Sequence, residues 1–442
     1  MTKKAIILLL LVFIGIAGFS QGVKTYYWLN KNKKSEGAFK DSVMVGKWTF
    51  WYDNNTKWME GEYKSGKKTG LWNYWYNDGK KKGEINSENG TCLSWYINGQ
   101  MEKEGKVVNT LKEGTWTTWW DNGKKKEESI YTKDKKEGRG YSWYDNGQLE
   151  FDGFYSADSL EGYATWWYKN GKKEMEGKSI NDLQDSIWIY YNSNGNVGSK
   201  GNFIKGKQDG LWTYWYETGE KWKEGNFIKG LKDGLWTAWY ESGEKQREGK
   251  FLNGKEEGKW VSWYKDGKVE DEGNFKKGLM EGTWIGYYKD GKIKYNTAYS
   301  KNLKNGKSSF WFPNGVKKYE GGYKNDMKDG SWCEWYETGL KIESGKYKED
   351  KKQGAWSFYD KFGIKYQDQE FRKGRPEGKW TSYYQNGQKM GTGAYSNNNK
   401  EGKWIYWDKM GKVVYVVIYE KGKKVKENKV AESELQKKNP QN

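Results

Sequence analysis

The residue types that carry most enzyme chemistry are scarce in this sequence of 442 residues. Histidine is absent, which excludes Ser-His-Asp and Cys-His catalysis and every His-ligated metal site. Asp and Glu are plentiful, but they stand among lysines in turn-like segments, and no spacing singles out a pair for general acid–base catalysis. We therefore expect a protein that is not an enzyme, with no catalytic residue, cofactor or metal site.

Three segments come close to the phosphate-binding loop, Gly-x4-Gly-Lys followed by Ser or Thr. Residues 61–67 and 201–207 have the glycine and lysine spacing, but Lys68 and Gln208 replace the required hydroxyl residue. A third segment has the correct ending at Ser308 but lacks the first glycine. Because no strand-to-helix transition surrounds these segments, we interpret them as by-products of a glycine-rich repeat.

Two cysteines are present, Cys92 and Cys333. Ten repeats of the pattern described below separate them, a distance far beyond the reach of a disulfide. Cys92 occupies a position that usually holds tryptophan, so we expect a small buried apolar side chain there. We expect Cys333 to be an unpaired thiol.

The formal net charge of +19 at pH 7 could favour nucleic acid, anionic lipid or acidic polymers as partners. Only four of the 78 basic residues are arginine, however, and arginine is the residue that suits bidentate phosphate and base recognition. The lysines also alternate with glutamates at the same place in each repeat, as in residues 124–128. This pattern favours charged strand edges that resist aggregation over a nucleic-acid site.

The first 20 residues read as a secretory signal peptide. Lys3 and Lys4 precede an apolar run over residues 5–17, and small residues lead to an expected cleavage after Ser20. The alternative is an uncleaved membrane anchor, but the run is short for a bilayer span. We expect an exported protein, periplasmic or extracellular, with no transmembrane segment after cleavage.

The remainder of the chain repeats one unit of 24 residues. Seventeen aromatic residues, called anchors here, follow one another at this interval, apart from one step of 20 between Trp75 and Trp95. The anchors are Tyr27, Trp51, Trp75, Trp95, Trp119, Trp143, Trp167, Tyr191, Trp215, Trp239, Trp263, Tyr287, Trp311, Trp335, Tyr359, Tyr383 and Trp407. Such self-similarity indicates a repeat array and overrides any domain count from length.

Other positions keep the same phase. Glycine stands five residues before the anchor, except at Ser186, and tryptophan stands three before it in most copies. Glycine also follows four residues after most anchors, often as Asn-Gly or Asp-Gly, and an aromatic residue usually stands twelve after. Aromatic segments bounded by these turn residues are typical of β-hairpins.

The predicted fold is therefore all-β: an elongated array of β-hairpins that forms a twisted single-layer antiparallel meander. The array is expected over residues 21–424, with about 17 copies, followed by a polar tail over 425–442. Because strand side chains alternate, Trp212 and Tyr214 should share one face while Thr213 and Trp215 share the other. One unit cannot bury enough surface to fold alone, so neighbouring units must stabilise each other.

The recurring pattern Gly-x-Trp-x-x-Trp-Tyr-x-x-Gly, followed by Lys-x-x-Glu-Gly-x-Phe, resembles the MORN repeat, in the variant of YwqK-type proteins. The resemblance covers roughly residues 22–424. It implies an array of β-hairpins and a role as a scaffold or adaptor, and it brings no catalytic residue with it. Proteins similar to YwqK are commonly labelled antitoxins, although an export signal departs from that label.

We expect a non-catalytic scaffold or adaptor that binds a protein partner or self-associates. The alternative is a module that binds glycans of the cell envelope, since rows of rings can stack on sugars. A third, lower-ranked reading is the antitoxin-like role. For a ligand-binding aromatic ladder, the candidate residues are Trp212, Trp215, Trp236, Trp239, Trp260 and Trp263.

Overall fold

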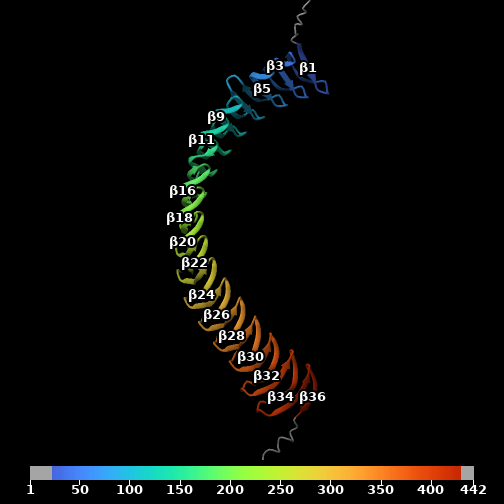
Figure 1. Cartoon of the computed structure of the whole chain (residues 1–442), viewed down its shortest axis with the longest axis vertical. Helices are drawn as coiled ribbons and strands as arrows, with labels where there is room; N and C mark the ends of the chain where they lie inside the picture. The colour runs from blue at the N-terminus through green and yellow to red at the C-terminus, as the bar shows by residue number, and fades with distance from the viewer. Residues whose placement is uncertain (1–21, 430–442) are drawn as a thin grey trace, which may run out of the picture. The chain divides into compact units, whose positions relative to one another are not determined.

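The computed structural model describes residues 22–429, which form two units, 22–207 and 208–429, each described here by itself (Figure 1). The expected signal peptide over 1–20 and most of the expected tail lie outside the described residues. Within 22–429 every regular element is a β-strand, which confirms the all-β prediction.

The first unit consists of short strands joined by tight turns. Its strands are β1 (Gly22–Tyr27), β2 (Lys33–Lys40), β3 (Val43–Trp51), β4 (Lys57–Lys64), β5 (Lys67–Trp75), β6 (Lys81–Asn86), β7 (Thr91–Trp95), β8 (Met101–Val108), β9 (Leu111–Trp119), β10 (Lys125–Thr132), β11 (Lys135–Trp143), β12 (Leu149–Ser156), β13 (Ser159–Leu160), β14 (Gly162–Trp167), β15 (Lys173–Ile180), β16 (Leu183–Tyr191) and β17 (Val197–Ile204).

The second unit continues the same alternation of eight- and nine-residue strands. Its strands are β18 (Lys207–Trp215), β19 (Lys221–Ile228), β20 (Leu231–Trp239), β21 (Lys245–Leu252), β22 (Lys255–Trp263), β23 (Val269–Lys276), β24 (Leu279–Tyr287), β25 (Ile293–Ser300), β26 (Leu303–Trp311), β27 (Lys317–Lys324), β28 (Met327–Trp335), β29 (Lys341–Lys348), β30 (Lys351–Tyr359), β31 (Lys365–Arg372), β32 (Arg375–Tyr383), β33 (Lys389–Ser396), β34 (Asn399–Trp407), β35 (Val413–Glu420) and β36 (Lys423–Lys429).

Within each unit consecutive strands pair antiparallel, as β18 does with β19 and β19 with β20, except that the short strands β13 and β14 both pair with β12. Such a meander contains only local connections, which is why a 24-residue sequence period is sufficient to specify it. The anchor ends the first strand of each hairpin, and the following turn is closed by two backbone hydrogen bonds. In one hairpin, Tyr240 N–H donates to the carbonyl of Glu244 at 2.8 Å, and Gly243 N–H donates to that of Tyr240 at 2.9 Å.

The short step between Trp75 and Trp95 is accommodated by two truncated strands. β6 has six residues and β7 has five, where the usual lengths are eight and nine. The register stays regular, with Ile85 opposite Cys92. The sequence leaves open whether this deletion shortens a strand pair or the turn between hairpins, and the structure shows a shortened strand pair.

The C-terminal boundary of the array differs from the expected one. Residues 425–429 were assigned to a polar tail, but they belong to β36, which pairs with β35 from Tyr415 opposite Lys429 to Glu420 opposite Lys423. Every residue of β36 is exposed and four of its seven are lysines. A charged strand of this kind discourages further strand pairing at the edge that no other strand of residues 22–429 covers.

In most copies the glycine five residues before the anchor lies at a bulge in the ladder. In β20, Gly234 has a φ of +70°, and the pairing with β19 skips it together with Leu235. This left-handed backbone is cheap for glycine and strained for other residues. The one departure, Ser186, adopts the same conformation with a φ of +60°.

Replacing Ser186 by glycine should therefore stabilise the first unit. Glycine avoids the strain that serine has in a left-handed conformation, which is worth about 1–2 kcal/mol. Glycine also makes the unfolded chain more flexible, which opposes this gain by about 0.4–1 kcal/mol. We therefore expect the free energy of unfolding to rise by about 1 kcal/mol. Amide hydrogen exchange in β15–β17 measures it locally. The matched control is Gly258→Ser, at the same position with a φ of +69°, which should lose a similar amount; a destabilised S186G would contradict the strain argument.

The core is a row of tryptophans, each of which covers a glycine of the preceding strand. In the second unit Trp236 is opposite Gly225 in the ladder, and a β-carbon added to Gly225 would lie only 2.2 Å from the indole. The ring of Phe227 meets Trp236 edge-on at 5.1 Å between centroids. Glycine–tryptophan pairs of this kind recur at Gly37–Trp48, Gly61–Trp72, Gly105–Trp116, Gly177–Trp188, Gly249–Trp260, Gly273–Trp284, Gly345–Trp356 and Gly393–Trp404. We call this row the glycine–tryptophan row and the side of the sheet that carries it the tryptophan face.

Copies that lack this glycine show what it does. Thr297 is opposite Ser308, where tryptophan is missing, and their hydroxyls share a hydrogen bond of 2.7 Å. Gln369 is opposite Trp380, which is only partly buried while its equivalents are buried. The indole can therefore lie flat on the sheet only where the facing residue has no side chain.

Candidate interaction surface

The six aromatic candidates do not form a single ladder. Trp212, Trp236 and Trp260 belong to the tryptophan face and are buried, with 1%, 4% and 4% of their surface exposed. Part of the cover comes from lysine: the ammonium of Lys232 lies 4.4 Å from the Trp236 ring centroid. The indole N–H of Trp236 donates to the carbonyl of Asn226 at 3.0 Å. These three rings stabilise the sheet and are closed to ligands.

The other three candidates, Trp215, Trp239 and Trp263, are anchors and lie on the opposite side, which we call the anchor face. Each is partly buried. The ammonium of Lys221 lies 5.1 Å from the Trp239 ring centroid, and that of Lys245 lies 5.6 Å from that of Trp263. The ammonium of each lysine thus lies over the next anchor ring.

Beside the anchors, the anchor face carries a repeated group of three polar side chains. The Thr237 hydroxyl donates to Glu248 at 2.9 Å, and Lys245 forms an ion pair with the same carboxylate at 2.7 Å. Burial would raise the pKa of Glu248, but the hydrogen bonds from Lys245 and Thr237 outweigh it and leave the pKa below its usual value. Equivalent groups occur around Glu36, Glu60, Glu128, Glu224, Glu320 and Asp368.

Neighbouring repeats are also joined by polar contacts to backbone carbonyls. The tyrosine after the anchor donates its hydroxyl to the carbonyl of the next anchor, as Tyr240 does to Trp263 at 2.8 Å. We call these contacts clips. They recur at Tyr52, Tyr76, Tyr96, Tyr144, Tyr168, Tyr216, Tyr264, Tyr288, Tyr336 and Tyr384.

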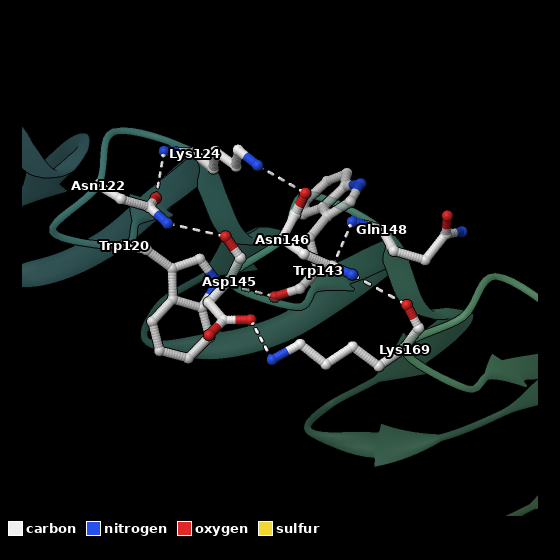
Figure 2. A network of polar contacts seen from close by, with 8 residues as sticks. All are labelled: Trp120, Asn122, Lys124, Trp143, Asp145, Asn146, Gln148 and Lys169. Atoms are coloured by element: carbon white, nitrogen blue, oxygen red, sulfur yellow. Dashed lines mark hydrogen bonds and ion pairs between the residues drawn. The ribbon is translucent and has the colours of Figure 1, made fainter.

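Figure 2 shows the variant of this arrangement in which Trp120 takes the place of tyrosine and donates to Trp143 at 2.9 Å. In the adjoining turn, the Asn122 amide donates to the carbonyl of Asp145 at 2.8 Å, and its oxygen accepts from Lys124 N–H at 3.0 Å. One repeat later, Asn146 makes the same pair of contacts. The turn asparagines therefore fix their own turn and join it to the next one.

Removing a single clip should have a modest and defined effect. We expect Tyr240→Phe to lower the free energy of unfolding by about 1 kcal/mol, the usual net value of one hydrogen bond. The matched control uses Phe312, which occupies the same position without a hydroxyl: Phe312→Tyr should create a clip and gain a similar amount. Amide hydrogen exchange in β20–β22 would report the change, and unaltered protection in Y240F would contradict a stabilising role.

The anchor face of the second unit carries an exposed aliphatic stripe. It consists of Leu211, Ile228, Leu231, Leu235 and Leu252, which are 50–55% exposed. Ile228 and Leu231 are opposite each other at one turn, and Leu231 reaches toward Gly254 in the next turn, beside Leu252. In other copies the same positions hold lysine, as at Lys259, Lys276 and Lys255.

Lysines surround this stripe. Lys229 lies in the turn between Ile228 and Leu231, Lys250 is opposite Leu235, and Lys255 is opposite Leu252; all three are exposed. The nearby carboxylates Asp209 and Asp233 instead accept hydrogen bonds from turn N–H groups of Lys229 and Asn253. The stripe thus has an apolar centre and a cationic rim.

The remaining residues that could carry chemistry, the two cysteines and the carboxylates, do not come together in a site. Cys92 and Cys333 are free thiols, and Cys92 is buried as expected; burial raises the pKa of both. No group of three or more Cys, Asp or Glu suited to a metal gathers anywhere in residues 22–429. The same residues contain no helix with the length and apolar character needed to cross a membrane.

Structural comparison finds similarity to the TcdB2-TccC3-Cdc42 structure, with 9% identity and a TM-score of 0.16, over 94% of this chain and 27% of that chain. The Photorhabdus luminescens Tc holotoxin pore with the TccC3-D651A mutation matches with 10% identity and a TM-score of 0.16, over 90% of this chain and 23% of that chain. This chain spans about a quarter of the length of those chains. No curated protein matches the sequence.

The sequence profile of the family described as MORN repeat variant matches nine segments of the chain. They are residues 44–65, 112–133, 136–157, 208–229, 232–253, 256–277, 280–301, 304–325 and 376–397. Each runs from the strand before an anchor, through the hairpin turn, to the end of the return strand. This chain is a MORN-repeat protein of the variant type.

Proposed function

We propose that the protein is a non-catalytic interaction scaffold whose anchor face binds a protein partner. The observation that supports the proposal best is the aliphatic stripe of Leu211, Ile228, Leu231, Leu235 and Leu252. Exposed aliphatic residues gathered on one face, within a polar surround, mark interaction sites on soluble proteins. Lysine at the same positions in other copies shows that the fold itself does not require aliphatic side chains there.

The cationic rim indicates which surface chemistry the partner should have. Lys229, Lys250 and Lys255 would meet carboxylates around the apolar centre, so the partner should present an apolar strip flanked by Asp and Glu. A second copy of this chain, which is strongly basic, fits that rim less well. Charge complementarity of this kind would speed association and would weaken with salt.

A crosslinking experiment tests this surface. A photo-crosslinking amino acid at Leu235, in the producing cell, should capture one acidic protein. The double variant Ile228→Lys/Leu231→Lys places lysine where other copies already have it, at Lys276 and Lys255. This variant should no longer form the crosslinked product, and its stability should be unchanged. The control is Leu303→Lys, at a leucine outside the stripe, which should retain it. Equal crosslinking in the double variant, or crosslinks only to a second copy of the chain, would refute the proposal.

We also propose that the protein is exported and acts outside the cytoplasm. Support comes from Lys3, Lys4, the apolar run over 5–17 and the small residues that end at Ser20. N-terminal sequencing of the protein from fractionated cells should find Gln21 first, in the periplasm or the medium. A chain that retains Met1 in the cytoplasm would overturn this part of the proposal and would make an antitoxin-like role possible.

A further inference from the structure

The glycine–tryptophan row is interrupted twice in succession in the first unit. Gly140 and Ala164 stand three residues before the anchors Trp143 and Trp167, where most copies have tryptophan. The ladder places Ser129 opposite Gly140. Two indole rings are therefore missing from adjacent hairpins on the same face.

A cavity of about 340 Å³ occupies this place on the tryptophan face. Three aromatic rings form its apolar wall, those of Phe151, Tyr155 and Trp166. Phe151 lies 5.0 Å from Trp166 and 5.9 Å from Tyr155 between ring centroids. The Tyr155 ring has moved into part of the vacated space, since a β-carbon on Gly140 would lie 2.9 Å from it.

A second interruption has the same consequence. Cys92 replaces tryptophan in the shortened hairpin, with Ile85 opposite it, and a cavity of about 310 Å³ opens between Tyr74, Cys92 and Lys103. These two cavities thus lie where an indole is missing. Polar side chains line both cavities, and the one at Gly140 differs in having three aromatic rings in its wall, where the one at Cys92 is lined by two aromatic residues, Trp58 and Tyr74.

The polar wall carries both donors and acceptors. Lys136 and Glu127 form an ion pair at 2.6 Å, and the buried Ser129 hydroxyl donates to Glu127 at 3.1 Å. Ser142 donates to Glu150 at 2.9 Å. Burial would raise the pKa of Glu127, but the hydrogen bonds from Lys136 and Ser129 outweigh this effect and leave the pKa of Glu127 below its usual value. Burial would likewise lower the pKa of Lys136, but the contact with Glu127 outweighs it and leaves the pKa of Lys136 above its usual value.

This combination narrows the ligand class. An apolar wall of rings suits a ring with an apolar face, and a mixture of ammonium, hydroxyl and carboxylate groups suits a ligand whose hydroxyls both donate and accept. A sugar ring has both properties. An organic cation could also stack on the rings, but a quaternary ammonium group has no hydrogen-bond donor or acceptor to offer the Lys136 and Ser142 side chains in the wall. The volume lies at the lower end of the range for ligand sites, which fits one ring.

We propose that the cavity bounded by Phe151, Tyr155, Trp166, Glu127, Lys136 and Glu150 binds a single neutral sugar unit of a glycan. Trp166 and Phe151 stack against the apolar face of the ring, and Glu127, Lys136 and Glu150 hydrogen-bond to its hydroxyls. This site is on the tryptophan face of the first unit, and it is independent of the aliphatic stripe in the second. The protein would thus bind a glycan and a protein partner at separate places.

Calorimetric titration of the purified chain tests the site. The probes are the methyl glycosides of glucose, galactose, mannose and N-acetylglucosamine, with choline as the cation. We expect at least one glycoside to bind and choline not to bind. No binding by any of the four glycosides, or choline binding that depends on the same residues, would overturn the proposal.

Two variants localise the binding. Ser129→Gly/Gly140→Trp restores the glycine–tryptophan pair of other repeats, so it should fill the cavity, weaken glycoside binding at least tenfold and leave the melting temperature equal or higher. Glu150→Gln removes a charged acceptor without changing the shape of the side chain and should weaken glycoside binding about tenfold. This variant tests the site even if S129G/G140W does not fold. Glycoside binding that is unchanged in E150Q and in a folded S129G/G140W would place the ligand elsewhere and refute the site.

Discussion

Replacing Gly225 by alanine should destabilise the hairpins around it by about 3 kcal/mol, the upper end of what overpacking costs. The new β-carbon would lie 2.2 Å from the Trp236 indole, and that ring is 4% exposed, with Phe227 packed edge-on against it. The glycine is required because of the ring above it, since Gly225 itself has no left-handed backbone conformation. Amide hydrogen exchange in β19–β21 should show the loss locally, because each repeat contacts only its neighbours.

A double variant separates this explanation from general damage to the strand. Gly225→Thr/Trp236→Ser reproduces the Thr297–Ser308 pair, which the same fold accommodates with a hydroxyl–hydroxyl hydrogen bond. We expect it to be no less stable than Trp236→Ser alone, a strongly non-additive result for two residues in contact. If the two single effects add, the close approach of ring and glycine is not the reason for the glycine.

Replacing Trp236 by alanine should lower the free energy of unfolding by about 3–5 kcal/mol, as for other large buried aromatic residues. The contrasting variant is Trp239→Ala, three residues away on the anchor face and partly buried. It gives up less buried surface, so we expect a loss of about 1–2 kcal/mol. Amide hydrogen exchange in β20, measured for both variants, gives the comparison.

Equal losses from the two tryptophans would contradict the assignment of the faces. A larger loss for Trp239→Ala would reverse it and make the Trp236 side the better candidate for ligand contact. Because the array need not unfold in one step, the comparison should rest on local exchange rather than on one global transition.

The sequence predicted the hairpins well because their determinants are local. Asn-Gly and Asp-Gly turns, aromatic strand residues and a constant interval set both strand and turn. For the shortened step at Trp75–Trp95 the sequence left two outcomes open, a shorter strand pair or a shorter turn between hairpins, and the structure has the first. The end of the array was misplaced because β36 is a run of exposed charged residues without an anchor. Its pairing with β35 comes from the neighbour and not from its own composition.

The distribution of buried and accessible rings was harder to predict. Trp212 and Trp215 differ only in the side of the strand, and both sides carry aromatic residues, so alternation alone did not show which side is closed. The missing signal was the second glycine, ten residues after the anchor, which faces the tryptophan of the next strand at Gly225 and Gly249. The clips could not be foreseen because their acceptors are backbone carbonyls, which leave no trace in residue type.

The clips always run from one repeat to the next one along the chain, and each acceptor is the carbonyl of an anchor. Most clips span 23 residues, yet the clip from Tyr76 to Trp95 spans 19 and is intact across the shortened hairpin. Removal or duplication of whole units would therefore leave every donor with an acceptor of the same kind. Recombination between the repeats of the gene could therefore add or remove whole repeats while every clip keeps a donor and an acceptor. The number of repeats can thus evolve separately from the stability of each repeat.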